Sequence, residues 1–334
     1  MITEKDLEFH HDADSPYTWS ETYYLPITIP EERLFGHVYC VTRPVIGSMS
    51  ADIRFQGSVS DTEFELLYSD TEYHLPCPER FSKIETPNGL SVVATKPPRD
   101  YRIDYVGYED TEIHVDMIGI MHPWDIHDAE LNPLAGGTPE EQLARTSMGS
   151  GYKGHYDMHC KVDGYIKIRG KEYKVDVVDR MNHSWGPRPE RHIPPMNSLW
   201  AQFGEELGFR WHLHLDPTKR AGEDQKLAHG YILDKGEVFA IVDAECSTTR
   251  LGIVPIALDM VLIDQRGKRF RLRGHPVCGA PWRAYATAIC WHGLIEWELE
   301  GKIGYGSLQE NHSLPVENQM RGRRWNDPIA FITA

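Results

Sequence analysis

The most informative stretch of this sequence lies between residues 179 and 188. The stretch combines a carboxylate, two guanidiniums, an amide, an imidazole and an indole: Asp179, Arg180, Asn182, His183, Trp185 and Arg188. A strand-like run precedes it, and a Gly-Pro break at 186–187 follows. Because loops commonly carry binding and catalytic groups on a rigid scaffold, we expect a functional site here, at the mouth of a strand. The alternative is a solvated turn anchored by the tryptophan.

Strand alternation gives the first acid in this stretch a direction. The apolar face of segment 173–179 ends in Asp179, so period two places this carboxylate on the apolar side. A carboxylate there needs a partner or carries a raised pKa. Arg180 lies on the opposite face, which leaves His183 or Arg188 as the partner. An Asp179–His183 pair would be a general acid–base unit, and an Asp–Arg bridge that locks the turn is the alternative.

A second cluster lies near the start of the chain. Trp19, Glu21 and Tyr23 alternate onto one face of the segment 17–24. A tryptophan, an acid and a tyrosine together can line a pocket and carry a proton, so Glu21 is the alternative catalytic acid. The competing interpretation is an edge strand with an anchoring tryptophan.

Histidines at two-residue and four-residue spacing suggest a possible metal site. His212 and His214 share one strand face, as do His155 and His159 with Asp157 between them. Metal ligands are often arranged in this way. The H-x-H pair lacks the glutamate that follows it in cupin-like sites, so we expect a polar barrel wall and no metal.

Signatures of cofactor chemistry are missing from the sequence. It has no G-x-G-x-x-G loop that opens a helix, no Walker motif, no G-x-S-x-G elbow and no C-x-x-C pair. An enzyme with this sequence would therefore rely on acid–base chemistry without a cofactor.

Composition narrows the possible partners. The formal net charge of −15 argues against nucleic acid and anionic membranes. No segment has the apolar length of a membrane span, and the acidic N-terminus lacks a secretory h-region, so we expect a cytoplasmic protein without membrane insertion.

The elements that must position these residues are mainly strands. Short alternating segments recur between Pro, Gly, Asp and Asn, and segments 155–168 and 171–180 predict a hairpin around Gly170. One helix is expected from the Thr138 cap to about Ser147. The chain of 334 residues exceeds one small barrel. We therefore predict an all-β fold of two packed antiparallel barrels or sandwiches, divided into residues 1–192 and 193–334.

The stretch Asn182-His183-Ser184-Trp185-Gly186-Pro187-Arg188 resembles the D-H-S-W-G-x-R motif of the AttH/CrtC-like family. This family includes carotenoid hydratases, kievitone hydratase and Diels–Alderase-like proteins. The segment 19–24 is similar to a W-x-E-x-Y-Y stretch of related bacterial proteins. The resemblance implies two tandem lipocalin-like β-barrels, with a pocket for a bulky apolar ligand near their junction and no cofactor. Asn182 departs from the family's aspartate, and our hypothesis is that Asp179 compensates.

These observations favour a cofactor-independent lyase of the hydratase or dehydratase type. Its substrate would be a hydrophobic isoprenoid, steroid, polyketide or phenolic molecule. Asp179 with His183, or Glu21, would transfer the proton, and Arg188 and Arg180 would orient the acid or bind a substrate oxygen. The residues expected to contact the substrate are Trp19, Tyr23, Arg180, Asn182, Trp185 and Trp200. The alternatives are a non-catalytic carrier of a hydrophobic small molecule and a metalloenzyme that uses His212 and His214; a homodimer is possible in each case.

Overall fold

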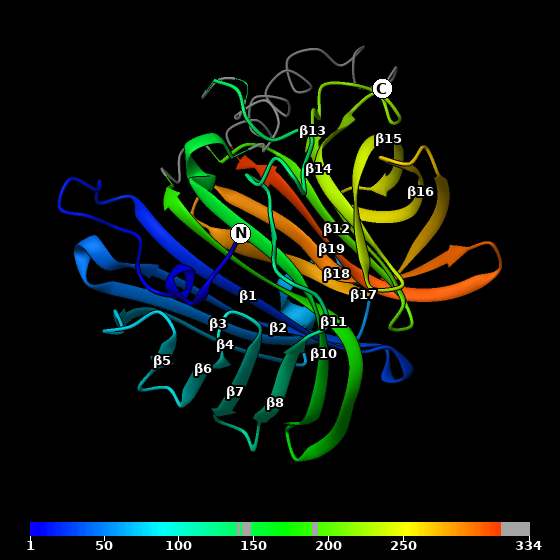
Figure 1. The fold of residues 1–334 in the computed structure, drawn as a ribbon. Coiled ribbons are helices and arrows are strands. Elements are labelled where there is room, and N and C mark those ends of the chain that lie inside the picture. The colour runs from blue at the N-terminus through cyan, green and yellow to red at the C-terminus, as the bar shows by residue number, and fades with distance from the viewer. Residues whose placement is uncertain (139–140, 142–147, 189–192, 315–334) are drawn as a thin grey trace, which may run out of the picture.

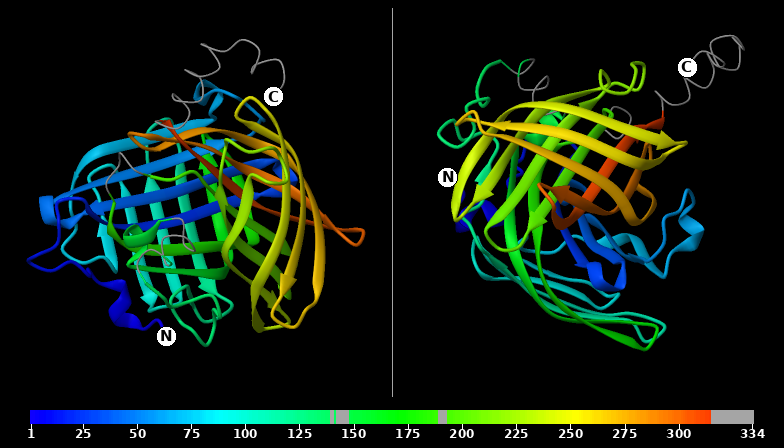
Figure 2. Two further views of the ribbon diagram at one scale, coloured as in Figure 1. Left: turned by 90° about the horizontal axis from the view of Figure 1, so that it is seen from above. Right: turned by 90° about the vertical axis from the view of Figure 1, so that its right-hand side faces the viewer.

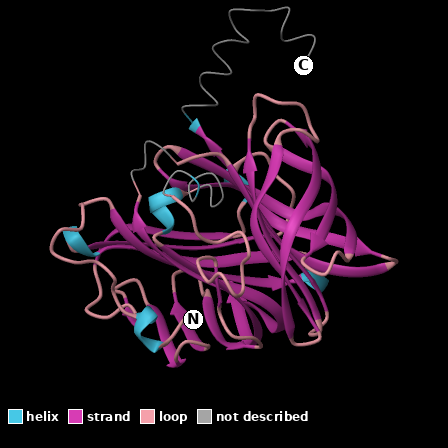
Figure 3. Ribbon diagram, turned by 45° about the horizontal axis from the view of Figure 1, so that its top comes forward, coloured by secondary structure: helices cyan, strands magenta, loops and turns pink. Residues whose placement is uncertain are grey.

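The computed structural model describes residues 1–138, 141, 148–188 and 193–314. Strands dominate, with only short helical turns between them (Figure 3), which confirms the predicted all-β fold of tandem barrels. The described residues include the 3-10 helices η1 (Glu4–Leu7), η2 (Pro30–Glu32), η3 (Pro44–Ile46), η4 (Glu63–Glu65) and η5 (Gly149–Tyr152). No helix in this part of the chain is long and apolar enough to cross a membrane.

The first unit is an antiparallel sheet that curls into an open half-barrel (Figure 1). Its strand order is β4-β3-β2-β1-β11-β10-β8-β7-β6-β5, with β9 paired to β10. The strands are β1 (Trp19–Ile29), β2 (Leu34–Arg43), β3 (Ser48–Gln56), β4 (Tyr68–Pro76), β5 (Lys83–Glu85), β6 (Leu90–Lys96), β7 (Asp100–Val106), β8 (Glu112–Gly119), β9 (Trp124–Asp125), β10 (Gly154–Ile168) and β11 (Lys171–Pro187). The cluster at residues 19–23 therefore lies on an internal strand, between β2 and β11, and not on an edge.

The second unit is a closed barrel that packs beside the curled sheet (Figure 2). Each strand pairs with the next in the chain, and β12 closes the barrel against β19. Its strands are β12 (Met196–Phe203), β13 (Leu207–Leu215), β14 (Gln225–Asp234), β15 (Glu237–Leu251), β16 (Val254–Asp264), β17 (Arg269–Tyr285), β18 (Ala288–Leu299) and β19 (Lys302–Ser313). Closure leaves no unpaired edge in this unit.

The predicted hairpin around Gly170 is present, but its second strand is longer than expected. β11 continues through the reactive stretch to Pro187, so these residues do not form a turn at the mouth of a strand. The reason is pairing on both sides: Ser184 lies opposite His155 of β10 and Thr22 of β1. Pairing with β1 and β10 satisfies the backbone hydrogen-bonding groups of this polar segment. The neighbouring strands therefore override its turn-like composition.

The predicted helix at 138–147 falls almost entirely outside the described residues. The two that are described, Thr138 and Glu141, exchange the expected capping hydrogen bonds: Thr138 N donates to Glu141 Oε2 at 2.7 Å, and Glu141 N donates to Thr138 Oγ1 at 3.3 Å. The proposed boundary after residue 192 stays a prediction; the curled sheet's last strand ends at Pro187, and the barrel's first begins at Met196.

Each unit has its own apolar core, and a polar junction lies between them. At its centre is Asp157 of β10, which is fully buried. Its Oδ1 accepts a hydrogen bond from Arg210 Nε of β13 at 2.8 Å, and its Oδ2 lies 2.9 Å from His155 Nε2. The guanidinium of Arg180 is 3.9 Å away. Burial on its own would raise the pKa of Asp157, but Arg210, the contact with His155 and Arg180 hold it well below its usual range.

Candidate functional site

Because β11 is a regular strand, its reactive residues divide between two faces. Met181 and Trp185 belong to the half-barrel's apolar core, and His183 contacts the aromatic rings of that core. Asn182, Ser184 and Arg188 instead line a cavity at the junction with the barrel. The stretch therefore contributes to two sites.

On the half-barrel side, five of the predicted site residues lie together. Tyr23 of β1 is directly opposite His183 of β11, and Glu21 is opposite Trp185. Cross-strand partners on one face have side chains in contact. We call this group, Trp19, Glu21, Tyr23, His183 and Trp185, the aromatic chamber. All five side chains are buried.

Glu21 is the acid of the aromatic chamber. It accepts hydrogen bonds from Trp19 Nε1 at 3.1 Å and from the backbone N–H of His10 at 2.7 Å. Its Oε2 lies 3.0 Å from His10 Nδ1 and 3.9 Å from His183 Nε2. These contacts fix the carboxylate between two imidazoles.

His183 sits at the centre of aromatic packing. Its ring centroid lies 4.5 Å from that of Phe81, 4.9 Å from that of Trp185 and 5.1 Å from that of Tyr23. Both of its ring nitrogens are buried without a hydrogen-bond partner. Burial, and then the neighbouring His10, hold the pKa of His183 well below its ordinary value, so the imidazole is neutral near pH 7.

The hydroxyl of Tyr23 is also buried without a partner. Burial raises the pKa of Tyr23 well above 10, so the hydroxyl keeps its proton. The chamber thus offers proton acceptors, Glu21 and His183, beside a hydrogen-bond donor, in apolar surroundings.

His10 was not predicted to belong to this site. It precedes the first strand in a segment without periodicity, where His10 and His11 stand among acidic residues. In the structure its ring stacks on Trp185, with centroids 3.7 Å apart and planes 2° from parallel. The N-terminal segment therefore closes the chamber, and Glu8 ties that segment to the Phe81 loop through Arg80 and Ser82.

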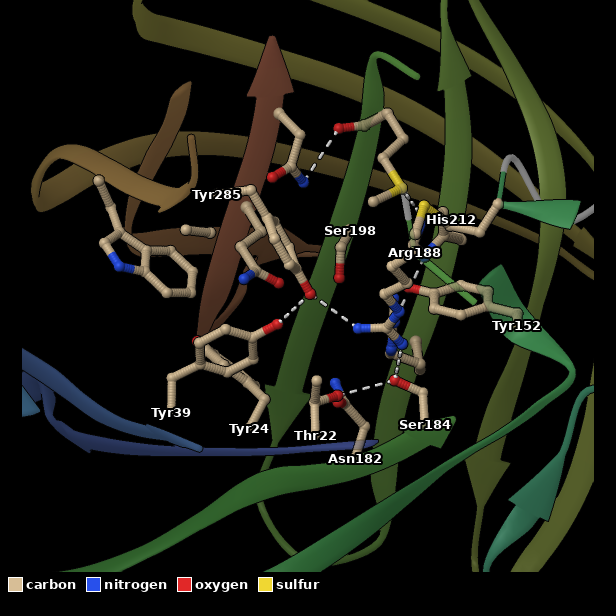
Figure 4. Close-up of a pocket in the computed structure, with 17 residues that line it drawn as sticks. Thr22, Tyr24, Tyr39, Tyr152, Asn182, Ser184, Arg188, Ser198, His212 and Tyr285 are labelled. Carbon is tan, nitrogen blue, oxygen red and sulfur yellow. Dashed lines mark hydrogen bonds between the residues drawn. The ribbon is translucent and has the colours of Figure 1, made fainter. Parts of the chain in front are cut away.

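On the junction side, Arg188 organises a small cavity (Figure 4). Its Nη1 donates to Tyr285 Oη at 2.8 Å, its Nε donates to Gly151 O at 3.1 Å, and its Nη2 donates to Ser184 Oγ. The hydroxyls of Tyr285 and Tyr39 are 2.8 Å apart. Strands from both units contribute to this cavity, so it exists only when the two units are packed together.

Residues 4–314 match the family described as Domain of unknown function (DUF7064). The chain belongs to this family. Two solved structures share its fold, each with a TM-score of 0.51 and 12% sequence identity. One is an AttH-like protein from Nitrosomonas europaea, covering 87% of this chain and 91% of that one; the other is kievitone hydratase from Nectria haematococca, covering 90% of both chains. No curated protein matches the sequence.

These comparisons confirm, at the level of fold, the resemblance to the AttH/CrtC-like group. The DUF7064 match spans both units of the chain. The C-terminal half, which showed little beyond general β character in the sequence, is therefore part of the same architecture. Because identity is low, this likeness carries the fold and not the activity.

The predicted Asp179–His183 pair is not formed in this DUF7064 protein. Four residues of extended strand separate the two side chains by about 13 Å. Asp179 Oδ1 accepts the Arg180 backbone N–H at 2.8 Å, while Oδ2 has no partner of normal hydrogen-bond geometry. Burial raises the pKa of Asp179 to about 6. The carboxyl and Trp200 line a separate cavity of about 230 Å³.

Potential metal ligands gather at a place that was not expected. In the part of the chain that the structure describes, one group of three possible ligands is found: His10, Glu21 and His183, with their atoms within 4.8 Å of one another. His212 and His214 are not in it. His212 Nε2 instead lies 3.1 Å from Met196 Sδ, and its ring stacks on that of His229. His212 thus contributes to the polar junction.

Proposed function

We propose that this protein is a hydratase- or dehydratase-type lyase that acts without a cofactor, with its chemistry in the aromatic chamber. The observation that carries the proposal is the pairing of Glu21 with His183, 3.9 Å apart, inside apolar aromatic walls. Carboxylate–imidazole pairs accept and return protons, and low-dielectric surroundings strengthen their effect on a substrate.

The proposed reaction is the reversible elimination of water. In the dehydration direction, Glu21 or His183 takes the proton from carbon, and the C–H electron pair forms the double bond. The C–O bond breaks as the Tyr23 hydroxyl gives its proton to the departing oxygen, which leaves as water. The proton held by Glu21 or His183 then returns to Tyr23. The faces of Trp19 and Trp185 stabilise positive charge that develops on carbon.

The substrate class follows from the walls of the chamber. Indole, phenol and phenyl rings favour a flat or branched hydrophobic molecule, such as an isoprenoid, a steroid or a phenolic compound. Entry requires displacement of His10 and the N-terminal segment, since they close the chamber. The shared fold with kievitone hydratase is consistent with this chemistry and supports it only as a fold-level analogy.

The test is isotope incorporation. Purified protein is incubated with a panel of prenylated phenols, isoprenoid alkenes and steroids in H₂¹⁸O, and products are analysed by mass spectrometry. We expect the label in a hydrated product, and a loss of turnover of about 100-fold or more in Glu21→Gln and in His183→Gln. The matched control is His275→Gln, whose side chain is 61% exposed on the barrel.

The outcomes of this experiment distinguish a cofactor-free lyase from a carrier and from a metalloenzyme. Full turnover in both chamber variants overturns the assignment. A ligand that binds but is always recovered unlabelled and unaltered indicates the carrier instead. Stoichiometric metal in chelator-free protein, with activity lost on chelation, overturns the cofactor-free mechanism and indicates a metal held by His10, Glu21 and His183.

A further inference from the structure

Arg188 is a buried cation without a buried anion beside it. The residue is 3% exposed, and its hydrogen bonds go to neutral oxygens of Gly151, Ser184 and Tyr285. Among residues 1–138, 141, 148–188 and 193–314, no carboxylate lies within ion-pair distance of it. Burying a guanidinium is unfavourable unless an anion compensates it. Two further buried cations of the junction, Arg210 and Arg180, have such a partner in Asp157.

The cavity beside this guanidinium has the size and lining of an anion site. Its volume is about 50 Å³, room for a group no larger than a carboxylate. Hydroxyls of Thr22, Ser184 and Tyr285 line it together with Arg188 (Figure 4). A planar guanidinium with neighbouring hydroxyl donors is the arrangement that recognises carboxylates best.

A larger groove lies next to the cavity. Its volume is about 520 Å³, within the range of small-molecule sites. Ala284 and Tyr285 line both spaces, so the cavity and the groove adjoin at these two residues. Val41, Ile46 and Met49 form an apolar part of the groove, and Arg43, His74 and Arg283 line the rest of it together with serine and tyrosine side chains. Its apolar part can hold a hydrocarbon body while an acidic end reaches the cavity.

We propose that the cavity and groove together bind an amphipathic monocarboxylate, with its carboxylate on Arg188 and its apolar body in the groove. This site lies on the opposite face of β11 from the aromatic chamber and does not depend on the function proposed for the chamber. Arg188 is thus the group that selects an acid over a neutral molecule of the same shape.

The test is calorimetric titration of the full chain with dodecanoate and with dodecanol as the neutral analogue. We expect dodecanoate to bind more tightly, and Arg188→Gln to weaken dodecanoate binding by about 10- to 100-fold with little change for dodecanol. Arg271→Gln is the matched control, because that guanidinium is 60% exposed on the barrel surface. Equal binding of both probes, or unchanged dodecanoate binding in Arg188→Gln, overturns the proposal.

A second variant keeps the test decisive if Arg188→Gln does not fold. Ala284→Trp places an indole where the cavity and the groove adjoin, and it leaves the Arg188 guanidinium in place. We expect it to abolish dodecanoate binding while hydration in the aromatic chamber continues. Undiminished dodecanoate binding in this variant overturns the groove assignment. If Glu21→Gln loses hydration activity but still binds dodecanoate, the two sites act independently, and either proposal can fail without the other.

Discussion

The raised pKa of Asp179 makes the stability of this protein depend on pH in a direction that can be measured. The carboxyl is fully buried, and burial raises its pKa from 3.8 to about 6. A rise of about two pKa units corresponds to about 3 kcal/mol of free energy. This is the penalty that the folded protein incurs at high pH for ionising a group in a low-dielectric place.

The sign of the effect follows from where the proton is bound. Below pH 4, Asp179 is protonated in both states and costs nothing. Between about pH 4 and pH 6 the unfolded chain loses the proton while the folded protein keeps it, so stability falls as pH rises. Above the folded pKa the loss is complete. Asparagine cannot ionise, so Asp179→Asn should gain up to about 3 kcal/mol relative to the wild type between pH 4 and pH 8.

The assay is urea unfolding at intervals from pH 4 to pH 8, followed by tryptophan fluorescence. At each pH, the free energy of unfolding of the wild type is subtracted from that of the variant. The change of this difference with pH excludes any effect of the amide that does not depend on pH. Asp176→Asn, three residues earlier on β11, is the control. Hydrogen bonds from Lys161 and Lys174 lower the pKa of Asp176 to about 2, so its difference should stay flat over this range. A flat line for Asp179→Asn as well would refute the reasoning.

Three further predictions concern packing and charge. Asp157→Asn should lower stability by about 3 kcal/mol or more, since it leaves buried guanidiniums unpaired, whereas the same change at the exposed Asp259 should cost less than about 1 kcal/mol; urea midpoints measure both. Gly154→Ala places a Cβ 2.0 Å from the Trp185 ring, so we expect a shift of the tryptophan emission maximum and a decrease of about 1–3 kcal/mol in the free energy of unfolding. Glu8→Gln weakens the tie between the N-terminal segment and its neighbouring loop, and faster amide hydrogen exchange in residues 1–11 should result; unchanged exchange would exclude a closing role for this contact.

Local pattern was enough to predict elements that carry the candidate site residues. Alternation placed Trp19, Glu21 and Tyr23 on one strand face, and the hairpin at Gly170 was predicted from turn chemistry. Both are short-range properties, since side-chain direction in a strand depends only on period two. The end of β11 could not be predicted in this way, because its last residues are strand only through pairing with β1 and β10.

The sequence by itself determined which residues can do chemistry and which of them share a strand face. The tertiary structure decided which faces meet. Register between β1 and β11 brings Glu21 to His183, while the same strand's extension keeps Asp179 away from it. Packing of the barrel against the sheet buries Arg188 beside Tyr285. The N-terminal segment folds back over β1 and β11, so that the His10 ring stacks on that of Trp185. These contacts join residues distant in the chain, and no local preference encodes them.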